Sequence, residues 1–267
     1  MKAGYSYTRS RNSVDPGSIA AGSWTNNPIV DDANNPELAL SAYSAGPRFF
    51  IAPTYTHNFF KFGATTVGAF FDMSRACTVT LGCNTSYIFS GDMNHDGGSA
   101  NDLIYIPNNT SEMNFQTFTA PNGGPTFTAA DQTAAFEAYI KQDDYLSGHR
   151  GQFAERGAVS FPVVARIDLS ISQGVFKDAG GARHSGEIRL DITNFGNMLN
   201  SDWGVSQSVI QNRILTNPAV DAQGKAIYRL ATVGSGANTK LVSKTFQTNA
   251  AIADVYVMML SFRYRFN

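Results

Sequence analysis

The sequence predicts an all-β fold: an antiparallel transmembrane β-barrel segment, about six strands of a larger barrel, with long extracellular loops. Three observations favour this fold. Apolar and polar residues alternate with the period of two that strands show. No apolar run approaches the ~18–20 residues of a membrane helix. Long and short connections alternate along the chain, as they do between the strands of outer-membrane barrels.

The final stretch, residues 253–267, shows the clearest strand pattern. Every second residue from Tyr256 to Phe266 is apolar or aromatic, whereas the alternate positions turn polar toward Arg263 and Arg265. A tilted strand of about 9–11 residues spans a bilayer, and aromatic side chains gather where such a strand meets water. The stretch is typical of the closing strand of an outer-membrane barrel, although Asn267 follows the aromatic residue that usually ends such a strand.

Five earlier segments alternate in the same way, and we expect strands at residues 2–9, 48–57, 64–73, 166–172 and 187–193. Tight connections near residues 58–61 and 177–181 join two pairs of them. The other connections are long and rich in turn-forming residues. If the C-terminus is periplasmic, every short connection falls on the periplasmic side and every long one outside, which is the arrangement of bacterial barrels.

The alternation also predicts which side chains meet lipid. We expect the apolar set to contact lipid, namely Ile167, Leu169, Ile171, Ile188, Leu190 and Ile192. Asp168, Arg189 and Asp191 alternate with them, and we expect these to face a wet lumen. In the alternative interpretation, a soluble β-sandwich, the same charged residues would face solvent.

Composition agrees with a barrel. Charged residues make up 15% of the 267 residues, below the roughly 25% of ordinary soluble domains, and aromatic residues reach 12%. The net charge of −1 does not favour nucleic acid or an anionic lipid surface as a partner. Residues 1–5 are not a signal peptide, since no apolar segment follows them. An outer-membrane protein must be exported, so we expect its true start to lie upstream.

A dense polar stretch at residues 90–102 contains the candidate metal ligands. Asp92, Asn94 and Asp96 stand at positions 1, 3 and 5 of an EF-hand-like calcium loop, and Gly97 stands at position 6. Leu103 takes the twelfth position instead of the usual Glu, so Asp102 or Asn101 would have to complete the site. The alternative is a set of Asx-turns, in which Asp and Asn side chains bond to their own backbone.

Two further motifs concern structure. Cys77 and Cys83 lack the Cys or His partners of a zinc site, and the oxidising periplasm favours a local disulfide over two free thiols. Residues 128–131 resemble a capping box, and Phe136, Tyr139 and Ile140 then fall on one face of a short helix. Residues 234–240 lack the Gly before Lys of a phosphate loop, and no catalytic constellation is recognisable, so we do not expect an enzyme.

Several motifs carry a family resemblance. Residues 91–97 and 101–107, with the pattern GDxNxDG followed by NDLxYIP, resemble a segment of TonB-dependent transporters of the Oar-like type. The same family is matched in the expected order by Trp24 and by the stretches at 34–38, 145–151, 154–156, 167–169, 191–195, 197–200 and 203–204. Arg48 and Gly157 depart from the family pattern, and residues 75–85 look like an insertion.

The resemblance covers nearly all of residues 1–267 and implies that they form the C-terminal part of the transporter's barrel. It implies a bacterial outer-membrane location and a barrel of about 22 strands. Its partners would be outer-membrane lipid, the remainder of the barrel with its plug, and the TonB complex through the missing N-terminal part. Two alternatives stay open: an outer-membrane adhesin or structural barrel that binds through its surface loops, and a secreted carbohydrate-binding β-sandwich.

Overall fold

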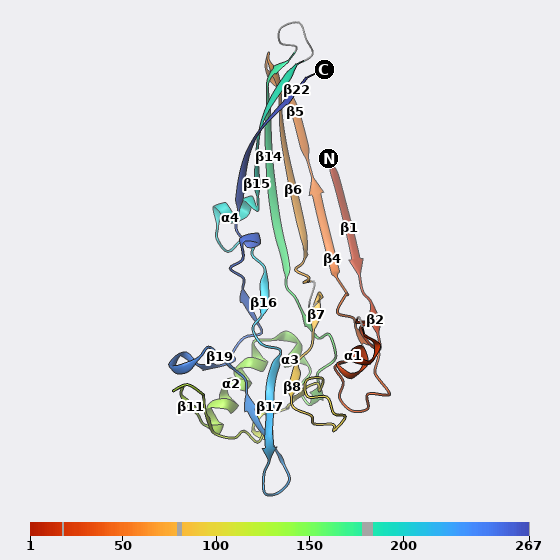
Figure 1. The fold of residues 1–267 in the computed structure, drawn as a ribbon, viewed down its shortest axis with the longest axis vertical. Helices are drawn as coiled ribbons and strands as arrows, with labels where there is room; N and C mark the ends of the chain where they lie inside the picture. Colours follow the sequence, from red (N-terminus) through yellow and green to blue (C-terminus); the bar gives the residue numbers. More distant parts are fainter. Residues whose placement is uncertain (18, 79–81, 178–183, 267) are drawn as a thin grey trace.

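The computed structural model describes residues 1–17, 19–78, 82–177 and 184–266, and it is mostly β (Figure 1). All six predicted strands are present, and they form one antiparallel sheet in the order β1-β4-β6-β14-β15-β22, with β5 paired to β6. The strands are β1 Lys2–Thr8, β4 Gly46–Ala52, β5 Thr54–Phe60, β6 Gly63–Arg75, β14 Val163–Lys177, β15 Ser185–Thr193 and β22 Val257–Arg265.

The bounds of several strands differ from the prediction. The closing strand begins at Val257 and not at Ala253, because a 3-10 turn, η4 Ile252–Asp254, precedes it. Pro53 divides the predicted strand at residues 48–57 into β4 and β5, because proline has no N–H to donate to the ladder. Strand β14 extends beyond the predicted end at Ser172, and Gln173 still pairs with Thr65. The predicted turn at residues 177–181 lies outside the described residues beyond Lys177.

The register of the sheet separates its two faces, since directly opposed residues on paired strands share a face. One row consists of Tyr55, Val67, Ile171, Leu190 and Leu260, and the next of Ala69, Leu169, Ile192 and Met258. We call the face with these rows the apolar face. The opposite, polar face has a row formed by Thr56, Thr66, Ser172, Arg189 and Ser261.

The three predicted charged residues share the polar face, where Arg189 and Asp191 form an ion pair. Arg189 bonds to Asp191 at 2.8 Å on β15, and Arg48 of β4 bonds to Asp72 of β6 at 2.8 Å. Asp168 accepts a hydrogen bond of 2.7 Å from the backbone N–H of Asn194. The prediction that apolar and charged side chains occupy opposite faces is therefore confirmed.

Most of the residues of the three long connections fold together at one end of the sheet into a globular region that we call the cap, whereas α4 (Phe195–Leu199) of the third connection lies beside the sheet (Figure 1). The first contains β2 Arg11–Asn12, α1 Ala20–Thr25 and β3 Ala39–Leu40. The second contains β7 Asn84–Thr85, β8 Ile88–Ser90, β9 Tyr105–Ile106, η1 Thr110–Glu112, β10 Phe118–Thr119, β11 Thr126–Phe127, α2 Ala129–Lys141, α3 Asp144–Gly148, β12 Gln152–Phe153 and β13 Val159–Ser160. The third contains α4 Phe195–Leu199, β16 Gln207–Val209, β17 Arg213–Val220, β18 Ala226–Leu230, β19 Thr232–Val233, η3 Gly236–Asn238, β20 Lys240–Leu241, β21 Phe246–Thr248 and η4 Ile252–Asp254.

The cap has a hydrophobic core of its own, so its connections are not the plain loops that the sequence suggests. Residues from the second and third connections share that core, including Tyr87, Phe89, Ile104, Phe136, Tyr139, Ile140, Ile214, Leu215 and Leu230. Many of the cap strands have only two or three residues, too few for an alternation to be visible in the sequence. They also pair across long sequence separations; for example, β17 pairs in parallel with β8.

Helix α2 begins as the sequence predicts. Thr128 Oγ1 accepts a hydrogen bond from the N–H of Asp131 at 3.1 Å, and Asp131 accepts one from the N–H of Thr128 at 2.9 Å. This reciprocal pair is a capping box. Phe136, Tyr139 and Ile140 are buried in the core of the cap, which confirms the predicted helical face.

One predicted lipid contact is wrong. Ile192 is only 6% exposed, because the protein itself covers the apolar face near the cap. Helix α4 begins three residues later and packs on β14, with Gly196 lying over Ile167. Ile188, nearer the other end of the sheet, is 43% exposed.

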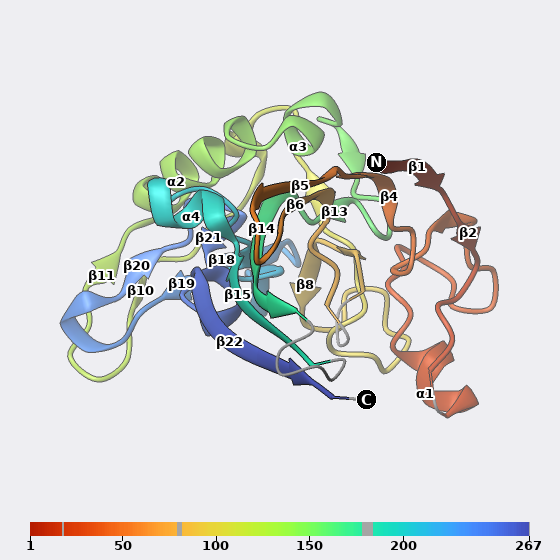
Figure 2. The same ribbon diagram turned by 90° about the horizontal axis from the view of Figure 1, so that it is seen from above.

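Seen from above, the sheet is curved, and β1 and β22 lie at its two edges (Figure 2). Within the described residues, each of these edge strands is paired on one side only. The described strands therefore form an open sheet and not a closed barrel.

Candidate functional site

The predicted metal-binding stretch forms a closed loop between β8 and β9. The N–H of Gly91 donates to Ser99 O at 3.0 Å, and the N–H of Phe89 donates to Asp102 O at 2.8 Å. These bonds join the two ends of the loop at its base. Residues far apart within the predicted motif, such as Asp92 and Asp102, are thereby brought to the same region.

The first three predicted ligands accept hydrogen bonds from the backbone of their own loop. Asp92 accepts from the N–H groups of Asp96 and Gly97, each at 3.1 Å, and Asn94 Oδ1 accepts from the N–H of Asp96 at 3.0 Å. Asp96 accepts from the N–H of Gly98 at 2.6 Å. The Asx-turns of the alternative interpretation are therefore present. A carboxylate offers about four lone-pair sites, so these bonds leave acceptor capacity on both acids.

Asp102 and Asn101 lie beneath this loop, and each is 2% exposed. Asp102 Oδ2 accepts from the N–H of Met93 at 2.7 Å, while its Oδ1 has no hydrogen-bond partner. Asn101 donates from Nδ2 to Asp96 Oδ2 at 2.8 Å, and its own Oδ1 has no partner either. Burial raises the pKa of Asp102, and the negative charges of Asp96 and Asp92 raise it further.

The carboxylates do not by themselves form a metal centre in this conformation. In the part of the chain that the structure describes, no three His, Cys, Asp or Glu side chains are grouped closely enough to hold a metal ion. A cation at this loop would therefore need amide or backbone oxygens as well. Asn94 and Asn101 supply amide oxygens on the same loop.

The loop is fastened to the first connection of the chain. Asn94 Nδ2 donates to Asp31 O at 2.9 Å, and Ile29 forms a parallel bridge with Asp102. Asp31 also lines a neighbouring cavity of about 410 Å³. Three other carboxylates line it, those of Asp32, Glu37 and Glu155.

Cys77 and Cys83 form the predicted disulfide, with an S–S distance of 1.99 Å. The N–H of Cys83 donates to Ala42 O at 2.6 Å. The disulfide therefore holds the cap end of β6 beside the first connection.

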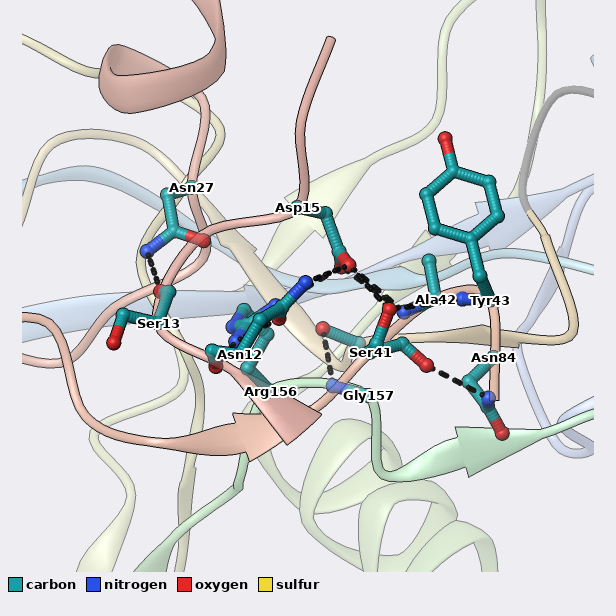
Figure 3. A network of polar contacts seen from close by, with 11 residues as sticks. Asn12, Ser13, Asp15, Asn27, Ser41, Ala42, Tyr43, Asn84, Arg156 and Gly157 are labelled. Atoms are coloured by element: carbon teal, nitrogen blue, oxygen red, sulfur yellow. Dashed lines mark hydrogen bonds and ion pairs between the residues drawn. The ribbon is translucent and has the colours of Figure 1, made fainter. Parts of the chain in front are cut away.

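Sequence reasoning missed a buried polar network centred on Arg156 (Figure 3). The Arg156 side chain is 4% exposed and bonds to Asp15 Oδ2 at 2.9 Å. Its other terminal nitrogen donates to Asn12 Oδ1 at 2.8 Å and to the Asn12 backbone O. Asp15 and Arg156 are separated by 141 positions, so no local pattern indicates the pair.

The same network ties the first connection to Asn84 of β7. Asp15 accepts hydrogen bonds from Ser41 Oγ at 2.7 Å and from the N–H of Ala42 at 3.0 Å. Buried Asn84 donates from Nδ2 to the backbone O of Ser41 at 3.0 Å. Burial of Asp15 acts to raise its pKa, but the hydrogen bonds from Asn12, Ser41 and Ala42 and the charge of Arg156 outweigh it, and the pKa is lowered.

The comparisons with known proteins add no family. No helix among the described residues has the length and apolar character needed to cross a membrane. A scan against models of protein families, a search of curated proteins and a search of solved structures each found no match.

Proposed function

We propose that this chain is the C-terminal barrel part of a TonB-dependent transport protein in the bacterial outer membrane. The observation that supports this function is a sheet with continuous apolar rows on one face and polar rows on the other, whose long connections all gather at one end. Outer-membrane barrels have the same apolar outer band, polar interior and long loops on one side.

The exposed apolar surface favours a lipid environment. Leu260 is 73% exposed, and Phe262 and Met258, on the same face of β22, are more than half exposed. Monomeric soluble proteins rarely expose contiguous apolar patches larger than a few hundred Å². In contact with lipid hydrocarbon, these apolar side chains no longer bear the free-energy cost of exposure to water. The ion pairs of the polar face stay in a water-filled interior.

Aromatic residues at the end of the sheet opposite the cap support the same orientation. Phe60 and Phe62 stack at 5.1 Å between ring centroids, and Tyr264 lies 6.1 Å from Phe176. Aromatic girdles mark the membrane–water interfaces of barrels. In this proposal these rings lie at the periplasmic interface and the cap lies outside the cell.

The open edges require more strands. Strands in lipid must pair every backbone N–H and C=O, and only a closed barrel does this. We propose that further strands of the transporter pair with β1 and β22, that a plug fills the lumen, and that the TonB complex acts through that plug-bearing part.

The folded cap favours one second candidate, an outer-membrane adhesin or structural barrel that binds partners through this surface. A carbohydrate-binding β-sandwich is disfavoured, because among the described residues no second sheet packs on the apolar face.

A matched pair of arginine substitutions tests the orientation of the sheet in lipid. Leu190 lies on the apolar face of β15, while Ser170 lies one row away on the polar face and pairs with Asp191. In the complete barrel, with the further strands supplied and inserted into phosphatidylcholine vesicles, Leu190→Arg should lower the free energy of unfolding by about 2–4 kcal/mol, the cost of Arg near the bilayer midplane. Ser170→Arg should cost less, because its guanidinium reaches water and Asp191. Equal losses in denaturant titrations would count against a lipid-facing sheet.

A further inference from the structure

We infer that the loop at residues 91–102 binds one calcium ion through Asp92, Asn94, Asp96 and Asp102. This site is independent of the proposed transport function, since it rests on residues of the cap alone. The spacing of Asp92, Asn94 and Asp96 in the sequence suggests the site. A separate structural observation supports it: Asp102 is buried, and its Oδ1 has no hydrogen-bond partner.

Asp102 has a carboxylate oxygen that needs a partner. The residue is 2% exposed, and its Oδ1 has neither a hydrogen-bond partner nor contact with solvent. Burying an ionised carboxylate without full pairing is costly, so such groups are normally paired or bound to metal. The other oxygen bonds to the N–H of Met93, between Asp92 and Asn94, which places this carboxylate directly under the loop.

The charges at the loop are not balanced by basic side chains. The negative charges of Asp96 and Asp92 act on the buried carboxyl group of Asp102. Among the described residues, no Lys or Arg forms an ion pair with any of the three. Among the basic groups of the described residues, His95 also acts on Asp102. A divalent cation would supply the missing positive charge.

The donor chemistry indicates calcium. All the candidate ligands are carboxylate or amide oxygens, which suit hard cations, and the loop offers no thiolate for zinc. Asn101 Oδ1, buried and unpartnered, adds one more oxygen. Calcium accepts six to eight oxygens in irregular geometry, whereas magnesium requires a nearly ideal octahedron. Gly97, at φ +87°, allows the sharp turn that the ligand spacing needs.

Binding requires a modest movement of side chains. In the present conformation the three carboxylates are not gathered around one point. Asp92 and Asp96 are held by backbone N–H groups that use only part of their acceptor capacity. In this proposal their side chains rotate toward Asp102 Oδ1 to bind the ion. Because the loop also bonds to Asp31 and Ile29, an ion here would stiffen its attachment to the first connection.

The test is calorimetric titration of the detergent-solubilised protein, stripped with chelator, with calcium chloride. We expect one ion per chain, weaker binding of magnesium, and a dissociation constant of about 10⁻⁴–10⁻³ M, as in extracellular calcium modules. Asp102→Asn keeps the shape of the side chain and removes its charge, so it should weaken binding at least about tenfold, the factor equivalent to 1.4 kcal/mol.

Asp32→Asn is the matched control, because Asp32 makes an exposed Asx-turn to the N–H of Asn34 at 2.9 Å and lies outside the loop. It should leave calcium affinity unchanged. Proteolysis of the wild-type protein between Gly91 and Asn108 gives a readout that needs no variant, and chelator should accelerate cleavage there. Absence of binding heat, equal affinity loss in both variants, or cleavage that is identical with and without chelator would each overturn the calcium site.

Discussion

Replacing Arg156 with Met should loosen the junction between the first connection and the rest of the cap. The substitution keeps much of the side-chain volume but removes the charge bonded to Asp15 and two hydrogen bonds to Asn12. Breaking a buried ion pair from one side costs about 3–5 kcal/mol. Asp15 keeps its bonds from Asn12, Ser41 and Ala42, and its side chain is 27% exposed. We therefore expect the low end of the range, about 3 kcal/mol.

Amide hydrogen exchange measures this loss of stability locally, at the backbone N–H groups next to the Asp15–Arg156 network. The N–H of Ala42 bonds to Asp15, and the N–H of Gly157 bonds to Ser86 Oγ at 2.9 Å, so both report opening of the network. A loss of about 3 kcal/mol should speed their exchange by more than about 100-fold, since each 1.4 kcal/mol is a factor of ten. Amides in the middle of the sheet, such as that of Leu190, should keep their rates.

Lys141→Met provides the matched control. Lys141 is 70% exposed and forms a surface ion pair with Glu137 at 3.3 Å, one turn away on α2. Such pairs contribute about 0.3–0.5 kcal/mol, so exchange near Lys141 should change by a small factor. If Arg156→Met accelerates exchange at Ala42 and Gly157 no more than Lys141→Met does near its own site, the reasoning about the buried pair is refuted.

Two further predictions concern the cap. Thr128→Ala removes the hydroxyl that caps α2 and should cost about 1 kcal/mol, measured as faster amide exchange in the first turn of the helix, while Thr128→Ser should restore most of it. The second concerns pH. Asp15 has a folded pKa below the 3.8 of a free aspartic acid, so its stabilising contribution is complete above that value and is lost as pH falls through the folded pKa. Exchange at Ala42 should therefore accelerate on acidification below about pH 4, and Asp15→Asn should flatten this dependence; an unchanged profile in the variant would contradict it.

The sequence by itself determined the strands and their faces. A strand places alternate side chains on opposite faces. The alternation in residues 166–172 and 187–193 therefore predicts that these stretches are strands and that Leu190 and Asp191 lie on opposite faces, without any tertiary information. The capping box at Thr128 and the disulfide between Cys77 and Cys83 also depend on residues close in sequence, and the structure confirms both predictions.

Only the tertiary structure decided how the long connections fold. The cap joins short strands from distant segments, and its central pair, Asp15 and Arg156, is 141 positions apart. The covering of Ile192 near α4 likewise depends on where the chain turns back after β15, because alternation assigns a face but not what packs on it. The unpartnered Oδ1 of Asp102 also depends on tertiary contacts. The sequence shows an acid near a ligand-like motif, and only the folded loop shows that this acid is buried with one oxygen lacking a hydrogen-bond partner. Local periodicity reports backbone geometry, whereas burial and polar pairing are set by contacts between segments that the sequence does not place side by side.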